Sequence, residues 1–184
     1  MSRKVLLAGA NPYVTLFDGD RPTAYASMWR VDWSRWGSGA VVVLWEAGRL
    51  RILADAEPLA SVVESSFVRH FDEARELPGW GAPVPVEVVA IQVRVDPDGG
   101  AVANAGDVTV ELSEVRDARP FATADFPLGG RSHGLAMLML PCAAATVRVG
   151  GRLLPGAPRT SVTEDGRFVS SAVATIHESW CGPA

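Results

Sequence analysis

The sequence predicts a mainly β protein, an antiparallel β-barrel or sandwich of about nine or ten strands with one amphipathic helix. Three observations support this fold class. Strand-length runs in which apolar and polar residues alternate cover most of the chain. Asp-Gly and Gly-Gly pairs separate these runs, as they do in antiparallel hairpins. A helical period is found in one segment alone. We therefore expect a single β-rich domain over residues 1–184.

The first half of the chain predicts two consecutive hairpins. The turn-forming residues Asp18 to Pro22 separate two β-prone runs, and Glu46 to Gly48 separate two more. Short runs joined by such turns are typical of antiparallel neighbours. The four expected strands cover residues 13–17, 23–31, 40–45 and 49–53.

One helix is expected over residues 56–72, because apolar residues recur there at spacings of three and four. Asp55 is placed to cap its first turn. The prolines and glycines of residues 76–85 permit neither a strand ladder nor a helix, so this segment is expected to link two β-rich halves. The apolar face of the expected helix consists of Leu59, Val62, Val63, Phe67 and Phe71.

The second half predicts strands and turns without interruption. Residues 89–95 and 108–112 alternate between apolar and polar side chains, as half-buried strands do. Residues 134–140 are apolar on both faces, and residues 168–180 form the last expected strand. So many strands would leave long exposed edges in one flat sheet. Closure into a barrel, or packing of two sheets, is therefore expected.

Composition and charge indicate an ordinary globular protein, with 48% hydrophobic and 21% charged residues and a formal net charge of −4. An acidic chain lacks the basic surface that sequence-independent nucleic-acid binding needs, so no nucleic-acid partner is expected. No apolar run approaches the roughly 18 residues of a membrane span, so no membrane partner is expected either. We expect a cytoplasmic protein, and abundant Arg, Ala, Gly and Val favour a bacterial source.

Residues that bind metals or act as nucleophiles are few and occur at no recognised spacing. Cys142 and Cys181 are expected to be reduced thiols, although the sequence leaves a disulfide between them open. His177 and Glu178 would point to opposite faces of a strand, so they cannot chelate one ion. No metal site is predicted, and no catalytic residue can be chosen.

The densest unusual cluster contains Trp29, Trp33, Arg35 and Trp36. Aromatic faces beside guanidinium groups suit a planar or anionic small molecule. The same rings also suit a hydrophobic plug at the end of a barrel, and their large buried area favours the plug by about two to one. Both interpretations stay open at this stage.

A second cluster follows the glycines at 129–130. Arg131 can act as a charge partner for an anion, and His133 as an acid or base. His133 shares a strand face with Met137 and Met139, and a histidine at the end of an apolar face is more often structural. We retain all four residues as candidate ligand-binding residues.

Two family resemblances follow from these features. The turn Asp18 to Pro22, the strand carrying Trp29, the hairpin at Gly48-Arg49-Leu50 and the helix after it are similar in order to flavin-binding split-barrel proteins. That resemblance implies an FMN or deazaflavin oxidoreductase whose cofactor phosphate lies at a strand-helix corner, here residues 54–61. The stretches Val147 to Gly151 and Leu154 to Gly156 resemble hairpins of calycin-type barrels, which implies an interior that holds apolar ligands.

The function expected from the sequence is the binding of a small apolar or amphipathic molecule in the interior or mouth of a barrel, without a cofactor. Trp29, Trp33, Trp36, Met137 and Met139 would line the site, and Arg35, Arg131 and His133 would orient a polar end of the ligand. A flavin oxidoreductase with FMN is one alternative. An interaction subunit with an aromatic interface, such as a homodimer, is the other. Whether the protein is an enzyme is left open.

Overall fold

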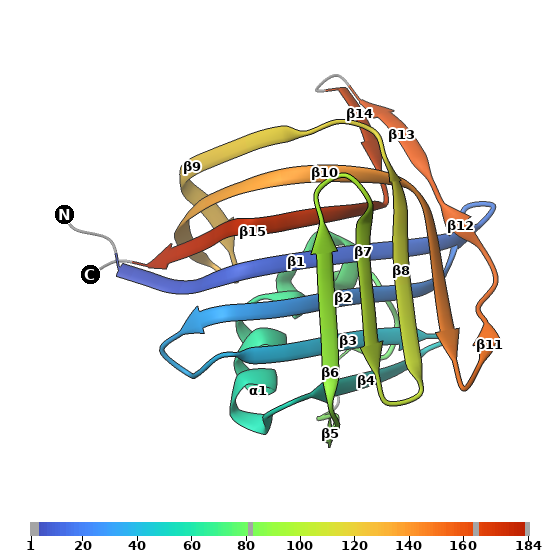
Figure 1. Ribbon diagram of the computed structural model, residues 1–184, viewed down its shortest axis with the longest axis horizontal. Coiled ribbons are helices and arrows are strands. Elements are labelled where there is room, and N and C mark those ends of the chain that lie inside the picture. Colours follow the sequence, from blue (N-terminus) through green and yellow to red (C-terminus); the bar gives the residue numbers. More distant parts are fainter. Residues whose placement is uncertain (1–3, 81–82, 164–165, 183–184) are drawn as a thin grey trace.

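The computed structural model describes residues 4–80, 83–163 and 166–182 (Figure 1). The mainly β fold with one principal helical segment is confirmed. The strands are β1 (Lys4–Asp18), β2 (Arg21–Ser34), β3 (Gly39–Glu46), β4 (Arg49–Ala54), β5 (Val86–Val88), β6 (Ile91–Asp96), β7 (Gly100–Ala105), β8 (Val108–Val115), β9 (Arg119–Leu128), β10 (Arg131–Val149), β11 (Arg152–Leu153), β12 (Ala157–Pro158), β13 (Thr160–Thr163), β14 (Gly166–Val169) and β15 (Ser171–Gly182).

Thirteen of these strands in the described residues belong to one sheet, whose main path runs β5-β4-β3-β2-β1-β15-β10-β8-β7-β6. All neighbours along this path are antiparallel except β4 and β5. The path is open, and the chain passes from one end to the other between Val88 and Ile91. The strand β9 pairs with the first part of β10, and β13 and β14 form a separate hairpin.

The sheet folds over itself because β10 belongs to both of its halves. From Arg131 to Met139 the strand pairs with β9, and from Cys142 to Val149 it pairs with β8. Between these partners lies Pro141, and Glu114 on β8 has a positive φ of 57°. Figure 1 shows that β10 bends along its length, so that β6, β7 and β8 cross in front of β1 to β4. A sandwich-like arrangement results.

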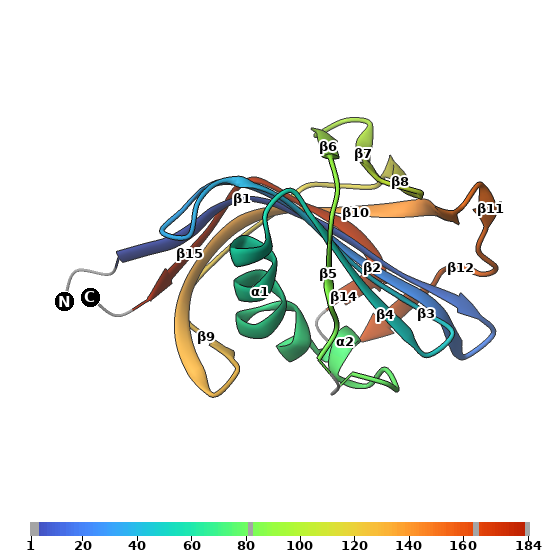
Figure 2. The ribbon, with the colours of Figure 1, turned by 90° about the horizontal axis from the view of Figure 1, so that it is seen from below.

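The main sheet is buried on both faces (Figure 2). Small and branched side chains of β1 to β4 pack against those of β6 to β8 on one face, including Val14, Val42, Val93, Ala103 and Val110. The opposite face packs against the helical segment through larger residues, including Trp29, Trp45, Leu59, Val63 and Phe67. The sheet therefore separates two hydrophobic cores, and burial on both faces explains the nearly continuous apolar runs of β2 and β3.

The expected helix over residues 56–72 is divided into α1 (Glu57–Ser66), the 3₁₀ turn η1 (Val68–His70) and α2 (Asp72–Arg75). Two aromatic residues cause the divisions. Phe67 (φ −125°, ψ −72°) and Phe71 (φ −67°, ψ 142°) leave the helical backbone conformation. Both rings pack against Trp29 and Trp180, so burial of the aromatic rings prevails over the helical period.

Asp55 does not cap α1, in contrast to the sequence prediction. The N-cap residue is Ala56, which makes no side-chain hydrogen bond to the helix. The Asp55 carboxylate instead accepts hydrogen bonds from the backbone N–H groups of Ala40 (2.8 Å) and Ile91 (2.9 Å). It thereby ties β3 to the start of β6, which belongs to the other layer of the sandwich.

The predicted strand number was too low, because nine or ten strands were expected and fifteen are found in the described residues. Most of the missed strands have two to four residues, too few to show an alternating pattern. The longer β9 was missed because most of its side chains are exposed, and its conformation depends on pairing with β10. Residues 76–80 and 83–85 of the expected linker contain no strand or α-helix.

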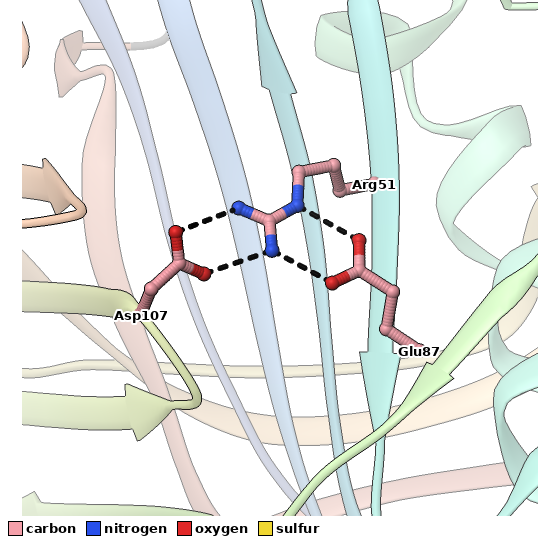
Figure 3. A network of polar contacts seen from close by, with 3 residues as sticks. All are labelled: Arg51, Glu87 and Asp107. Atoms are coloured by element: carbon pink, nitrogen blue, oxygen red, sulfur yellow. Dashed lines mark hydrogen bonds and ion pairs between the residues drawn. The ribbon is translucent and has the colours of Figure 1, made fainter.

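An ion network joins the edges of the two layers (Figure 3). Arg51 on β4 donates to both carboxylate oxygens of Glu87 on β5, at 2.8 and 2.7 Å. The same guanidinium donates to both oxygens of Asp107, in the turn between β7 and β8, at 2.8 and 3.4 Å. Hydrogen bonds from Arg51 hold the pKa values of both carboxyl groups below their usual range.

We predict that Arg51→Ala lowers the free energy of unfolding by about 1 kcal/mol, a modest value because all three groups remain partly exposed to water. The loss should be full near neutral pH and should disappear as the pH falls below about 4. Because both carboxyl pKa values are lowered in the folded state, their contribution to stability is full above the unfolded-state pKa values and is lost as the pH falls through the folded-state values. Urea unfolding at several pH values measures the effect.

Arg116→Ala is the matched control, since it removes an ion pair with Glu114 in which both partners are 62% exposed. We expect it to change stability by less than Arg51→Ala at every pH. An Arg51→Ala variant as stable as the wild type near pH 7 would contradict a fastening role for the network.

Candidate functional site

A cavity of about 370 Å³ lies on the helical side of the main sheet. Its floor is formed by β1, β2, β10 and β15, and its walls by β9 and by the segment from η1 to α2. Figure 2 shows β9 curling toward this side of the sheet. The lining residues are Asn11, Tyr13, Tyr25, His70, Phe71, Asp72, Glu73, Phe121, Phe126, Pro127, Leu128, Leu135, Met137, Met139, Phe168, Ala174, Glu178 and Trp180.

Glu178 is the most unusual residue of this lining. Its side chain is only 2% exposed, although it carries a titratable carboxyl group. One oxygen, Oε1, accepts a hydrogen bond from the Trp180 indole Nε1 at 2.8 Å. The other, Oε2, has no hydrogen-bond partner among the described residues. Burial raises the pKa of Glu178 to about 8, and the hydrogen bond from Trp180 opposes this rise.

The backbone of β15 is irregular just before Glu178. Glu178 lies opposite Gly9 on β1, whereas Asn11, two residues further along β1, lies opposite Ala174. The pairing of β15 with β10 shifts in the same region. A bulge of this kind changes the direction of the side chains that follow it, and bulges occur often beside functional sites. We infer that this bulge sets the orientation of Glu178.

Trp180 is held by a cluster of rings. Phe67 and Phe126 contact it edge-on, with ring centroids 5.1 and 5.4 Å away. His133 packs against it at 5.7 Å and Phe71 at 6.3 Å. Such contacts leave the indole little freedom to rotate. Its N–H group therefore stays directed at Glu178.

Tyr13 and Tyr25 supply hydroxyl groups to the cavity. Burial raises the pKa of both phenols above the usual value, and the negative charge of Glu73 raises both further. Glu178 adds to the rise at Tyr13. Both phenols are therefore neutral at physiological pH. The Tyr13 hydroxyl contacts the Met139 sulfur at 4.0 Å.

The mouth of the cavity is formed by exposed aromatic residues and by acidic residues of α2. Phe121 on β9 and Phe168 on β14 are 40% and 45% exposed while lining the cavity. Asp72 and Glu73 lie opposite them on the helical side. Among the described lining residues there is no lysine or arginine. The site is therefore acidic, with walls that are mainly apolar and aromatic.

The turn between β9 and β10 lies directly on η1. Gly129 in this turn has a φ of 59°, and a Cβ atom at that position would come within 2.9 Å of the His70 ring. The His70 Nε2 atom in turn lies 3.1 Å from the carbonyl oxygen of Ser65. This close approach joins the β9–β10 hairpin to the helical segment on the other side of the cavity.

The sequence-predicted site residues fall into separate groups. Met137 and Met139 line the cavity, and Trp29 lies behind it, stacked on Phe71 with ring centroids 6.3 Å apart. His133 is buried against Trp180, and burial lowers its pKa. The remaining candidates do not line the cavity. Arg131 is exposed at the start of β10, and Trp33 is 51% exposed. Arg35 and Trp36, beyond β2, form a cation–π pair in which the guanidinium carbon lies 4.4 Å from the ring centroid.

Sequence reasoning missed Glu178, Trp180 and Phe126. A detectable signal was present, since Glu178 and Trp180 are two positions apart and so lie on one face of a strand. Glu178 was considered only as a metal ligand beside His177. The contribution of β9 was not detectable, because that strand was not expected.

Cys142 and Cys181 form no disulfide in the structure. Cys142 is fully buried in the core between the two layers, where burial raises the pKa of its thiol to about 11. It is therefore protonated at physiological pH and packs as a small apolar side chain.

Comparisons with protein-family models, curated proteins and solved structures found no match for this chain. Within the described parts of the chain, no helix is long and apolar enough to cross a membrane. The cavity is therefore the feature from which a function can be inferred.

We predict that the wild type loses stability as the pH rises and that the Glu178→Gln variant does not show this loss. The folded-state pKa of about 8 lies above the unfolded value of about 4.3, so the wild type should lose stability as the pH rises between these values. At about pH 8 the variant should be more stable than the wild type by on the order of a few kcal/mol, with little difference near pH 4. Urea unfolding across this range measures the difference.

Glu111→Gln on β8 is the control, because Glu111 is exposed. It should be as stable as the wild type at both ends of the range. A difference between Glu178→Gln and the wild type that stays constant with pH would show that Glu178 is not a buried acid with a raised pKa.

We also predict that Gly129→Ala destabilises the protein more than Gly130→Ala. Both positions have positive φ values, 59° and 72°, so both variants should lose about 1 kcal/mol through backbone strain. Only at Gly129 would the new methyl group meet His70, because nothing lies within 4 Å of a Cβ at Gly130. Thermal unfolding measures both changes, and equal losses would show that the contact with η1 does not stabilise the hairpin.

Proposed function

We propose that the protein binds a small, largely apolar molecule in the cavity that contains Glu178. The observation that supports this proposal best is the combination of aromatic walls with one buried carboxyl oxygen that lacks a partner among the described residues. Buried polar groups are nearly always hydrogen-bonded in folded proteins. An unpaired oxygen in a cavity of ligand size therefore suggests that a bound molecule completes the hydrogen bonding.

The dimensions of the cavity support this function. Small-molecule sites usually enclose about 300–1,000 Å³ and combine apolar walls with a few polar groups that fix the orientation of the ligand. The cavity, at about 370 Å³, is at the lower end of that range. It suits a ligand with one or two rings and a single polar group. The exposed rings of Phe121 and Phe168 offer such a ligand an apolar entrance.

The proposed site lies on the helical face, outside the core between the two layers. Small residues of the two layers pack together in that core, including Ala24, Ala26, Ala101, Ala103 and Cys142. The ligand-binding hypothesis from the sequence is therefore retained, but with the site at a different location. Among the residues predicted from the sequence, Met137 and Met139 line this cavity.

The flavin alternative has less support. Its phosphate would require cationic or small polar side chains at residues 54–61, and this stretch contains Asp55 and Glu57 and no lysine or arginine. The Asp55 carboxylate accepts from two backbone N–H groups, and the Ser61 hydroxyl donates to the backbone of Glu57. An interface at Trp33 is supported by that residue's exposure alone. We therefore propose a non-catalytic binding protein and retain the cytoplasm as its predicted location.

We predict that the wild type binds the neutral fluorophore Prodan and that Met137→Trp weakens this binding at least about tenfold. The indole would fill the part of the cavity that Met137 lines. Fluorescence titration measures the dissociation constants, with the blue shift of the probe reporting an apolar environment. Native mass spectrometry of the purified protein gives an independent test for a bound molecule.

Val162→Trp is the matched control, since it adds the same ring at a position that is 77% exposed and does not line the cavity. It should bind Prodan as the wild type does. Absence of binding by the wild type, or equal binding by the two tryptophan variants, would count against the proposed site.

A further inference from the structure

The charges around the cavity indicate the chemical class of its ligand, an inference that rests on the proposed function above. We propose that the ligand is an organic amine, whose protonated nitrogen lies against the carboxylate of Glu178 while its apolar part lies among the aromatic walls.

The titratable side chains of the lining are mainly acidic. Asp72, Glu73 and Glu178 contribute three carboxyl groups, and the described lining residues include no lysine or arginine. Asp72 forms an ion pair with Arg75 at 2.9 Å, and burial raises the pKa values of Glu73 and Glu178. An ionised Glu178 therefore has no cationic partner within the lining. His133 lies beside Trp180, but burial lowers its pKa and so favours its neutral form. An anionic ligand would find no cationic side chain in this lining, whereas a cation can form an ion pair with the carboxylate of Glu178.

The unpaired oxygen requires a hydrogen-bond donor when Glu178 is ionised. Trp180 already donates to Oε1, so Oε2 is the carboxyl oxygen left without a donor among the described residues, on a side chain that lines the cavity. An ammonium group carries up to three N–H donors and a positive charge, and charge-assisted hydrogen bonds are roughly twice as strong as neutral ones. A hydroxyl group would satisfy the same oxygen without compensating its charge.

The rings complete a site for a cation. Tyr13, Phe71, Phe126 and Trp180 line the cavity together with Glu178, and Phe71 and Phe126 pack against Trp180. The faces of aromatic rings carry partial negative charge and attract ammonium groups within about 6 Å. A cavity lined by both a carboxyl group and aromatic rings therefore favours a cationic ligand over a neutral ligand of the same shape.

The pH dependence of the affinity provides a second test of an ion pair between Glu178 and an amine. The pKa of Glu178 is raised to about 8 by burial, so an ammonium ion that binds below this pH must displace the carboxyl proton to form the ion pair. Affinity for an amine should therefore rise by up to about tenfold per pH unit toward pH 8, until the amine itself loses its proton near pH 10. The other titratable groups that face the cavity are Tyr13, Tyr25, His70, Asp72, Glu73 and, behind Trp180, His133.

The test uses three probes of similar shape: 2-phenylethylamine, 2-phenylethanol and 3-phenylpropanoate. Isothermal titration calorimetry at about pH 8.5 should give at least a tenfold tighter dissociation constant for the amine than for the alcohol, with the carboxylate weakest. Glu178→Gln should abolish the preference for the amine and retain binding of the alcohol. Glu111→Gln, at an exposed position, should retain the preference.

The outcomes separate the two proposals. If the wild type binds none of the three probes, the proposed binding function fails together with the amine assignment. If the alcohol binds as tightly as the amine, or if Glu178→Gln keeps the preference, the binding function stands and the amine assignment is overturned. Tightest binding of the carboxylate would overturn it as well, since a protonated Glu178 would then act as the donor.

The wild type alone gives a test that does not depend on folding of a variant. Between about pH 6 and pH 8 its affinity for 2-phenylethylamine should rise at least tenfold, while its affinity for 2-phenylethanol should change little. Calorimetry in buffers of different ionisation enthalpy should show about one proton released per amine bound at about pH 6. Equal pH profiles for the two probes would contradict the ion pair.

Discussion

The bend of β10 is the constraint on which the rest of this structure depends. Because one strand pairs first with β9 and then with β8, the sheet folds over and buries one face of β1 to β4 under β6 to β8. The helical segment then has only the opposite face to cover. The cavity lies on that opposite face, where β9 continues beyond the bend and encloses a space beside the helical segment.

Burial of Glu178 carries a cost in stability, and the surrounding structure offsets it. An isolated carboxyl group removed from water is unfavourable in its charged form, which explains its raised pKa. Trp180 satisfies one of its oxygens, and four rings hold Trp180 in position. Structural features that reduce stability in this way occur often at functional sites. The two layers and the Arg51 network lie outside the cavity, so the site is built on an independently packed framework.

The parts of the fold that the sequence predicted are those in which local pattern and tertiary packing agree. Leu59 and Val63 face the sheet as their spacing indicated, and the runs around Val42 and Val110 form strands. The prediction failed where packing overrides pattern. Phe67 and Phe71 continue the helical period in sequence, yet their rings pack against Trp29 and Trp180 and end the helical conformation. Asp55 similarly bonds to backbone groups of β3 and β6 instead of capping the helix.

For the site, the sequence by itself determined the apolar strand face that contains Met137 and Met139, because alternation along one strand is a local property. It also determined the mainly β class and the position of the helical segment. Only the tertiary structure decided that Glu178 would be buried and that Trp33, Arg35 and Trp36 would lie outside the cavity. The physical reason is that burial of Glu178 depends on contacts between β15, β9 and α2, which are distant in sequence, and on a bulge that no local pattern indicates.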